Sequence, residues 1–293
     1  MPRFTVVMPA RNSSATIGLA VKSVLRTFPR DTEVVVWDDA SKDETSEVAL
    51  RAGEGRVQIM SSSRSMGGGV ARQKILAATD SEFVVNQDSD DVSLPWRYRL
   101  QSQLLEDADF AFTSTLRFSR WGPGRPSAPL PLDPSDVPIA LLIKNPLPHP
   151  TMVARRAALA DIGGYSGARL AQDYELWLRA ARHGKRIRLG GAPGLAYRVS
   201  PTQVSRHPEY GRRLADNEQL VISYASLLYE LLPSLGRRTS DVHDIEDLGK
   251  VGLEPLNALV GTMTPAVRFY YQQLLAAQRF GDIGSVVFKV RAL

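Results

Sequence analysis

FVVNQDSDD, residues 83–91, joins an apolar run to three carboxylates within four positions. Residues 83–85 are aromatic or β-branched, which is typical of a buried strand. The following acidic tetrad, Asp88-Ser89-Asp90-Asp91, would stand at the carboxyl end of that strand. Because carboxylates lose hydration beside a buried strand, three of them together are costly unless a cation binds there.

Two interpretations of the acidic tetrad are open. Mg²⁺ and Mn²⁺ prefer hard oxygen ligands, and Mg²⁺ is typically held by one or two carboxylates plus substrate phosphates. The tetrad therefore indicates a divalent metal that carries a diphosphate. Alternatively, the carboxylates form an acidic cap for a helix that begins near Pro95. These residues alone favour neither interpretation.

The first ninety residues alternate between strand and helix patterns. We expect strands at residues 4–8, 33–37, 57–60 and 83–86, with helices starting near residue 13 and spanning 43–52 and 69–79. Such an alternation predicts an α/β fold, with a mostly parallel sheet flanked by helices on both faces. In these sheets ligands bind outside the carboxyl ends of the strands.

Local signals indicate how the helices begin. Asn12, Ser13 or Ser14 is expected to cap the first helix, whose apolar face includes Leu19. Ser41 and Glu44 have the spacing of a capping box for the second helix.

The second half of the chain follows other patterns. Segment 119–138 is rich in proline and glycine, which predicts a flap beside the site or a plain surface loop. From about residue 210 the pattern is helical, and residues 286–291 would either pack on the main domain or touch a membrane or partner. Between these segments we expect a strand at 109–114 and helices at 94–105, 155–160 and 173–183.

The composition excludes several classes of protein. The chain has 293 residues, 43% hydrophobic and 23% charged, as in ordinary globular proteins, and it lacks cysteine, which excludes disulfides and cysteine catalysis. Residues 1–8 are too short for a signal peptide, and no segment approaches the ~20 apolar residues of a membrane span. We therefore expect a cytoplasmic protein, either free or peripheral at the inner face of a membrane.

The net charge of +5 would attract nucleic acid, anionic lipid or a nucleotide-linked substrate. The sequence shows neither zinc-ligand spacing nor a basic-aromatic RNA motif, so nucleic-acid binding is disfavoured.

Three more polar clusters follow predicted strands. Residues 9–12 close the first strand, and Asp38-Asp39 close the second. The two aspartates either cap the next helix or accept hydrogen bonds from a base N–H or ribose hydroxyls. Gly67 lies in a glycine run before a helix that carries Arg72. Such a run allows close approach of a phosphate, or serves only a tight turn.

In their order along the chain, these clusters resemble motifs of the GT-A glycosyltransferases, in particular the inverting family 2. The resemblance extends over about residues 4–205 and is carried by segments 9–12, 37–43, 65–73, 88–91, 149–151 and 172–179. It implies a GT-A, Rossmann-like fold in which residues 1–208 form the nucleotide-sugar-binding and catalytic domain, followed by a C-terminal helical region, residues 209–293.

The resemblance also implies a donor site. The donor would be a nucleotide-diphosphate sugar, with a UDP-sugar expected first, and the acceptor is not identified. Asp39 would accept from the base with Asp38 nearby, and Gly67 and Arg72 would lie near the nucleotide. Residues implied to line the base, the ribose or the donor sugar are Pro9, Ala10, Arg11, Asp88 and Ser89.

The same resemblance implies the catalytic groups. Asp90 would be the principal ligand of Mn²⁺ or Mg²⁺, with Asp91 beside it. Asp173 would be the general base that deprotonates the acceptor hydroxyl, so that direct displacement inverts the anomeric configuration. Without the resemblance, this aspartate at a predicted helix start would equally be an ordinary N-cap. His149 and Trp177 would belong to the acceptor pocket, or serve only the structure.

The chain departs from the family pattern at three positions, where Arg11 replaces a tyrosine, Gln172 a glutamate and Ser200 a histidine. His207 follows seven residues after Ser200. Two alternatives to a transferase are a non-catalytic nucleotide-sugar-binding or scaffold protein and a sugar-phosphate nucleotidyltransferase. The latter would be expected to carry a glycine-rich basic loop right after the first strand, and residues 9–14 lack one.

Overall fold

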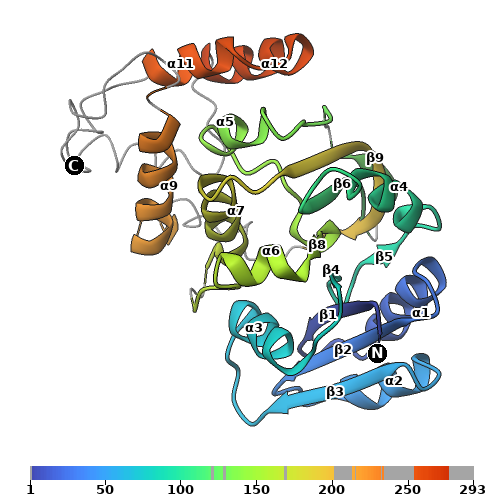
Figure 1. Cartoon of the computed structure of the whole chain (residues 1–293). Coiled ribbons are helices and arrows are strands. Elements are labelled where there is room, and N and C mark those ends of the chain that lie inside the picture. The colour runs from blue at the N-terminus through green and yellow to red at the C-terminus, as the bar shows by residue number, and fades with distance from the viewer. Residues whose placement is uncertain are drawn as a thin grey trace. The chain divides into compact units, whose positions relative to one another are not determined.

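The computed structural model divides into two compact units (Figure 1). The sheet unit comprises Met1–Pro129, Leu147–Arg169 and Arg186–Ser200, and the helical unit comprises Leu130–Pro146, Leu170–Lys185 and Pro201–Leu293. The structure describes residues 2–119, 122–127, 130–167, 170–200, 213–214, 216–231, 233 and 254–276. The expected boundary at residue 208 and His207 both lie outside these residues, and the boundary stays a prediction.

The sheet unit is built on one mixed sheet, with nine strands among the described residues. The strand order is β3-β2-β1-β4-β8-β6-β9-β5, and β7 pairs with β6. The strands are β1 Phe4–Ala10, β2 Thr32–Asp39, β3 Val57–Ser62, β4 Phe83–Asn86, β5 Val92–Ser93, β6 Phe110–Ser119, β7 Gly122–Pro126, β8 Val153–Arg155 and β9 Ile187–Arg198.

The first four strands form the expected parallel half of the sheet. β1 is paired in parallel with both β2 and β4, and β2 is paired in parallel with β3. Ala10 is in register with Asp38, and Asp38 with Ser61, so the polar residues after these strands gather at one edge. The expectation of an α/β fold with a mostly parallel sheet flanked by helices is confirmed.

The other half of the sheet is mixed. β8 pairs antiparallel with β4 and β6, whereas β9 runs parallel to β6. Because Val85 of β4 is opposite Val153 of β8, the segment before β8 lies beside the end of β4. This arrangement brings residues 149–151 close to the acidic tetrad.

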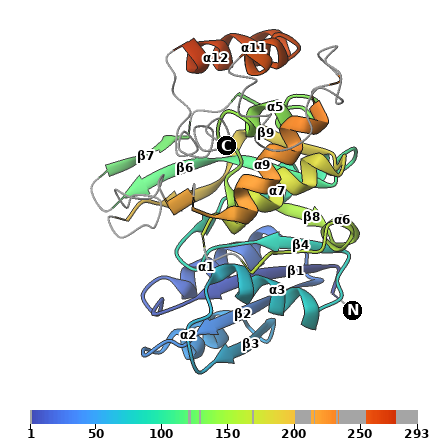
Figure 2. The ribbon, with the colours of Figure 1, turned by 90° about the vertical axis from the view of Figure 1, so that its left-hand side faces the viewer.

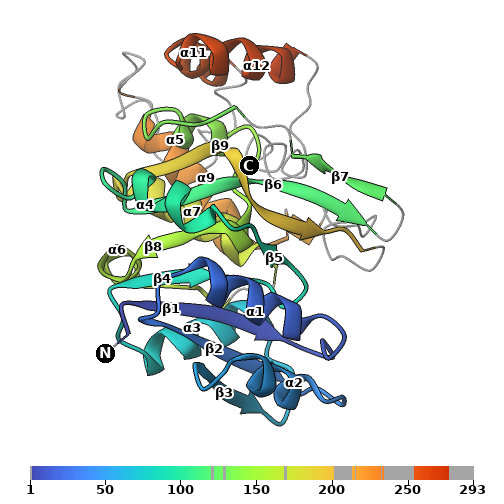
Figure 3. The ribbon, with the colours of Figure 1, turned by 90° about the vertical axis from the view of Figure 1, so that its right-hand side faces the viewer.

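Helices cover both faces of the parallel half. Figures 2 and 3 show α1 and α2 on one face and α3 on the other. The helices of the sheet unit are α1 Ile17–Thr27, α2 Thr45–Ala52, α3 Gly68–Ala78, α4 Arg97–Leu104 and α6 Arg156–Asp161, with the 3₁₀ turn η1 His149–Thr151.

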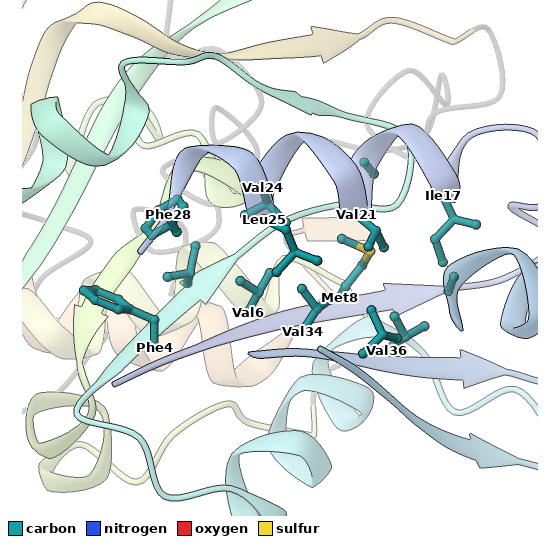
Figure 4. Close-up of a cluster of buried hydrophobic side chains, with 14 of the residues drawn as sticks. Phe4, Val6, Met8, Ile17, Val21, Val24, Leu25, Phe28, Val34 and Val36 are labelled. Carbon is teal, nitrogen blue, oxygen red and sulfur yellow. The ribbon is translucent and has the colours of Figure 1, made fainter. Parts of the chain in front are cut away.

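The hydrophobic core between α1 and the sheet is formed by the alternating side chains of the strands and by one apolar face of the helix. Alternate residues of β1, including Val6 and Met8, point to one face, and helix positions three and four apart form a matching stripe. Figure 4 shows these side chains interlocked with those of β2. Leu19, expected in the apolar face, is 55% exposed because it lies off this stripe.

The expected helix caps are wrong. α1 has Thr16 at its N-cap position, without a side-chain cap. α2 begins at Thr45 after Glu44, too late for Ser41 to cap it, and the Ser41 hydroxyl instead accepts from the Asn12 backbone N–H at 3.0 Å. The polar residues of these loops therefore join neighbouring loops at the carboxyl edge.

Segment 119–138 is not wholly a loop, because it contains β7 and the start of α5. β9 was not expected either, since glycine and proline interrupt its apolar pattern. A Cβ at Gly194 would lie 2.5 Å from the Thr113 hydroxyl, so this glycine permits the close approach of β9 to β6.

The helical unit confirms helices in the C-terminal region. Its described helices are α5 Val137–Leu141, α7 Gln172–Arg182, α9 Glu218–Leu231, α11 Glu254–Gly261 and α12 Pro265–Ala276. The Tyr224 hydroxyl donates to the Leu142 carbonyl at 2.7 Å, and Thr264 bonds to both carboxylate oxygens of Asp136. Among the described helices, none has both the length and the apolarity to cross a membrane. Residues 286–291 lie outside the described part.

A truncation in the sheet core should destabilise the sheet unit. Met8 is fully buried, and Met8→Ala should lower the free energy of unfolding by about 2–5 kcal/mol through lost burial and the cavity left behind. Native-state hydrogen exchange of the β1 and β2 amides measures this loss. Leu50→Ala, at a side chain that is 50% exposed, should change it by less than about 0.5 kcal/mol. Equal losses in both variants would contradict the assigned core.

Candidate donor site of the sheet unit

The acidic tetrad connects β4 directly to β5. α4 begins only at Arg97, with Trp96 at its N-cap and no side-chain cap. The interpretation of the tetrad as a helix cap is therefore wrong. The side chains of Asp88, Ser89 and Asp91 are instead bonded to residues from other segments at the carboxyl edge.

Each member of the tetrad has different surroundings. Asp88 accepts from Arg72 Nη2 at 2.7 Å, and the Ser89 hydroxyl lies 2.9 Å from that of Ser13. Asp91 is fully buried, and its Oδ1 accepts from the backbone N–H of Arg198 on β9 at 2.8 Å. Asp91 Oδ2 is buried without a hydrogen-bond partner among the described residues.

Asp90 is the carboxylate that remains available to a ligand. It is half-buried, and no other residue in the described part of the chain donates to its side chain. Burial raises the pKa of Asp90, and the negative charge of Asp88 raises it further. A bound cation would relieve both effects.

The tetrad fits a divalent metal only as part of an open site. Among the described residues, no three histidine, cysteine, aspartate or glutamate side chains form a metal cage. One or two carboxylates with an open side do fit a cation whose other ligands are phosphate oxygens and water. Asp90 and Asp88 provide that set. Asp91, expected beside Asp90 as a metal ligand, is fully buried with one oxygen bonded to β9, and its role as a ligand stays a prediction.

Two residues of β9 adjoin the tetrad. Arg198 Nε donates to the Asp90 carbonyl at 3.0 Å, and its guanidinium lies 4.8 Å from the centre of the Phe118 ring. Burial raises the pKa of Tyr197, and the charges of Asp88, Asp91 and Asp90 raise it further, so its hydroxyl lies in the field of the tetrad. The sequence pattern drew attention only to Ser200 in this segment and did not predict a role for these two side chains.

Asp39 holds the glycine loop. It accepts from the Ser65 hydroxyl at 2.6 Å and from the backbone N–H groups of Met66 and Gly67 at 2.7 and 3.2 Å. Burial raises the pKa of Asp39, but these hydrogen bonds and the nearby charge of Arg11 outweigh it and leave the pKa below its ordinary value. Asp39 is therefore ionised at neutral pH and joins the ends of β2 and β3.

The remaining nucleotide-site candidates lie at the same edge. Pro9 and Ala10 end β1, and the exposed Arg11 follows them. Asp38 accepts from the Ser41 backbone N–H at 2.8 Å and from the Ser46 hydroxyl.

Gly67 has φ of 87°, which favours glycine, and a Cβ there would meet nothing within 4 Å. The backbone conformation, and not crowding, therefore selects glycine before α3.

His149 belongs to a hydrogen-bonded network beside β4. Its Nε2 lies 2.8 Å from the Tyr165 hydroxyl, which accepts from Asn86 Nδ2 at 2.8 Å, while Gln73 Oε1 accepts from the Tyr165 backbone N–H. Burial lowers the pKa of His149 well below its ordinary value, and Arg72 lowers it further. The imidazole is therefore neutral at pH 7, which fits a positioning role. An acceptor-pocket role stays a prediction.

The other two candidates belong to the helical unit. Asp173 stands half-buried in the first turn of α7 and lies 3.5 Å from Asn145 Nδ2. The N-cap of α7 is Ala171 in a left-handed conformation, so Asp173 as the N-cap is wrong. Trp177 is fully buried in the same helix. Its placement in an acceptor pocket stays a prediction.

The family is decided by comparison with known proteins. The profile described as Glycosyl transferase family 2 matches residues 5–163. The chain belongs to glycosyltransferase family 2. Among curated relatives of this family 2 glycosyltransferase, the putative glycosyltransferase EpsE of Bacillus subtilis is 26% identical over 194 residues, 63% of this chain and 69% of EpsE. The succinoglycan biosynthesis protein ExoU of Rhizobium meliloti is 26% identical over 265 residues, 83% of this chain and 76% of ExoU.

Solved structures confirm the GT-A fold. S. aureus TarS 1-349, crystallised in complex with UDP, has a TM-score of 0.59 at 18% identity, covering 99% of this chain and 91% of that one. The mannosyltransferase PcManGT of Pyrobaculum calidifontis, in complex with GDP-Man and Mn²⁺, has a TM-score of 0.57 at 18% identity, covering 99% and 86%.

The hydrogen bonds of Asp39 predict that the free energy of unfolding depends on pH. Because the folded pKa lies below the unfolded one, these bonds stabilise the fold above the ordinary aspartate pKa of about 4, and their contribution is lost as the pH falls through the folded value. Asp39→Asn should therefore lose about 1–3 kcal/mol at neutral pH, and its difference from the wild type should shrink in acid. Denaturant unfolding at several pH values measures this.

The control is Asp31→Asn, at an exposed side chain. It should match the wild type at every pH. A constant Asp39→Asn deficit down to about pH 2 would contradict the assignment.

Proposed function

We propose that this glycosyltransferase moves a sugar from a nucleotide-diphosphate donor, first of all a UDP-sugar, to an acceptor hydroxyl with inversion. The observation that carries the proposal is the acidic tetrad, in which Asp90 is held at the strand edge with its carboxylate uncommitted. The structures of TarS with UDP and of PcManGT with GDP-Man and Mn²⁺ support a nucleotide donor and a metal.

The donor is bound at the carboxyl edge of the parallel strands. Asp90 and Asp88 would hold a divalent cation, Mn²⁺ or Mg²⁺, which when bound would supply positive charge for the departing diphosphate. Arg72, fixed against Asp88, and Arg198, fixed against the Asp90 carbonyl, add two cations beside the same position. Pro9 to Arg11 and Asp38-Asp39 line the base.

Asp173 is the proposed general base. It takes the proton of the acceptor hydroxyl while that oxygen bonds to the anomeric carbon, on the face opposite the diphosphate. The bond between the anomeric carbon and the diphosphate oxygen breaks in the same step, so no covalent enzyme intermediate forms. The first turn of α7 favours a negatively charged side chain at this position.

The expected location is cytoplasmic, free or at the inner face of a membrane. Family membership favours the transferase over both alternatives raised from the sequence, the scaffold protein and the nucleotidyltransferase.

Donor binding tests the proposal most directly. Thermal-shift measurements with UDP- and GDP-sugars should show a metal-dependent rise in melting temperature, since a ligand of the folded state stabilises it by mass action. Asp90→Asn should abolish that metal dependence and lower turnover by about 100-fold or more.

Asp107→Asn serves as the control, because Asp107 pairs with Arg186 and Arg188 on the surface. It should behave as the wild type. Unaltered metal-dependent turnover in Asp90→Asn would remove the metal assignment, and a wild-type protein that no nucleotide sugar stabilises would contradict the donor.

A second variant separates binding from chemistry. Asp173→Asn should bind donor as the wild type does, yet transfer sugar about 10²–10⁴-fold more slowly, because an amide cannot accept the acceptor's proton. Isothermal titration with donor and a transfer assay measure the two effects. Glu47→Gln removes an exposed acidic residue from the first turn of α2 and should leave both unchanged. An Asp173→Asn variant with an unchanged transfer rate would mean that another base operates.

A further inference from the structure

Arg97 is a fully buried arginine whose guanidinium is completely hydrogen-bonded. Nε donates to Gln101 Oε1 at 2.9 Å, Nη1 to Gln87 Oε1 at 2.7 Å and to the Ser93 hydroxyl at 2.9 Å. Nη2 donates to the carbonyls of Asn86 and Pro150 at 2.8 and 3.0 Å. These five bonds use all five N–H groups of the guanidinium.

The acceptors bracket the acidic tetrad. Asn86 and Gln87 directly precede Asp88, and Ser93 follows Asp91 by two residues. Gln87 Nε2 also donates to the Asp91 carbonyl at 3.0 Å, and the Ser93 hydroxyl donates to Gln87 Oε1 at 2.9 Å. Arg97 therefore bonds to residues on both sides of the tetrad and holds the two ends of this loop together.

The same side chain joins this loop to η1. Arg97 bonds to Pro150, and its partner Gln101 donates to the carbonyls of Thr151 and Ala111. Arg97 thus links the end of β4, β5 and η1, and through Gln101 also β6, all within the sheet unit.

Arg97 also lies in the electrostatic field of the tetrad. Burial lowers the pKa of Arg97 to about 9, whereas the charges of Asp91 and Asp88 raise it. The guanidinium therefore stays positively charged at neutral pH and partly offsets the repulsion among the three carboxylates from the buried side. The open side of the tetrad is left to a ligand.

We propose that Arg97 is a positioning residue for the donor site: it fixes the tetrad loop so that Asp88 and Asp90 present their oxygens to a cation bound by a nucleoside diphosphate. The inference rests on the proposed function. It accounts for an arginine at this position, since an ammonium group has three donors without a planar arrangement and cannot serve five acceptors on four segments.

Arg156 provides a matched control at the opposite end of β4. Its guanidinium donates to the carbonyls of Ser81 and Leu76 and to the hydroxyls of Thr79 and Ser81. Arg156 thus holds the segment before β4 as Arg97 holds the segment after it. The two arginines donate similar numbers of hydrogen bonds. Arg97 bonds to the end of β4 that carries the tetrad, and Arg156 bonds to the segment before the other end.

The experiment compares Arg97→Lys with Arg156→Lys in the full chain. Calorimetric titration with UDP in the presence of Mn²⁺, and with Mn²⁺ alone, measures binding, and the melting temperature measures stability. Both variants should have a lower melting temperature than the wild type. Arg97→Lys should also weaken Mn²⁺-dependent UDP binding by about 10- to 100-fold, as is usual when a group that orients metal ligands is lost, and Arg156→Lys should not.

Ser93→Ala keeps the test decisive if Arg97→Lys fails to fold. It removes one acceptor of Arg97 and should weaken Mn²⁺-dependent UDP binding in the same direction, by less than Arg97→Lys would. The inference is overturned if Ser93→Ala and any folded Arg97→Lys bind like the wild type, or if Arg156→Lys weakens binding equally. A wild-type protein that binds neither UDP nor GDP would instead overturn the proposed function, and the positioning role with it.

Discussion

Three carboxylates at the end of a buried strand repel one another and lose their hydration, and much of the sheet unit offsets this cost. Arg72 bonds to Asp88, the backbone of β9 donates to Asp91, and the buried Arg97 lies behind the loop. These partners neutralise the tetrad from its inner side. No other described residue donates to the Asp90 side chain, so burial and the charge of Asp88 leave the pKa of this carboxylate raised. The cation that we propose there would offset this unfavourable energy.

The parallel strands explain why so many loops meet the tetrad. Strands that run in one direction deliver their carboxyl ends to one edge, where short loops can exchange hydrogen bonds. Asp39, at the end of β2, fixes the glycine loop after β3, and Ser13, after β1, reaches Ser89 of the tetrad. The proposed donor site is thus built from loops that are hydrogen-bonded to one another.

The mixed half of the sheet supplies what the parallel half lacks. β8 pairs antiparallel with β4 and places η1 beside the tetrad, and β9 brings Tyr197 and Arg198. β9 can approach β6 because Gly194 has no side chain to collide with Thr113. On this strand Arg198 bonds to the Asp90 carbonyl and places a positive charge beside the tetrad.

The sequence by itself determined the parallel half of the fold, the family and the set of acidic candidates, because strand and helix periodicities and short motifs are local properties of the chain. It misplaced the caps at Ser13 and Ser41, missed β9, and overlooked Arg97 and Tyr197. These features depend on contacts between residues far apart in the chain, such as Arg97 with Pro150 and Asp91 with Arg198. Only the tertiary structure decided which carboxylate is neutralised and which is left for a ligand, since that depends on which donors folding brings within reach.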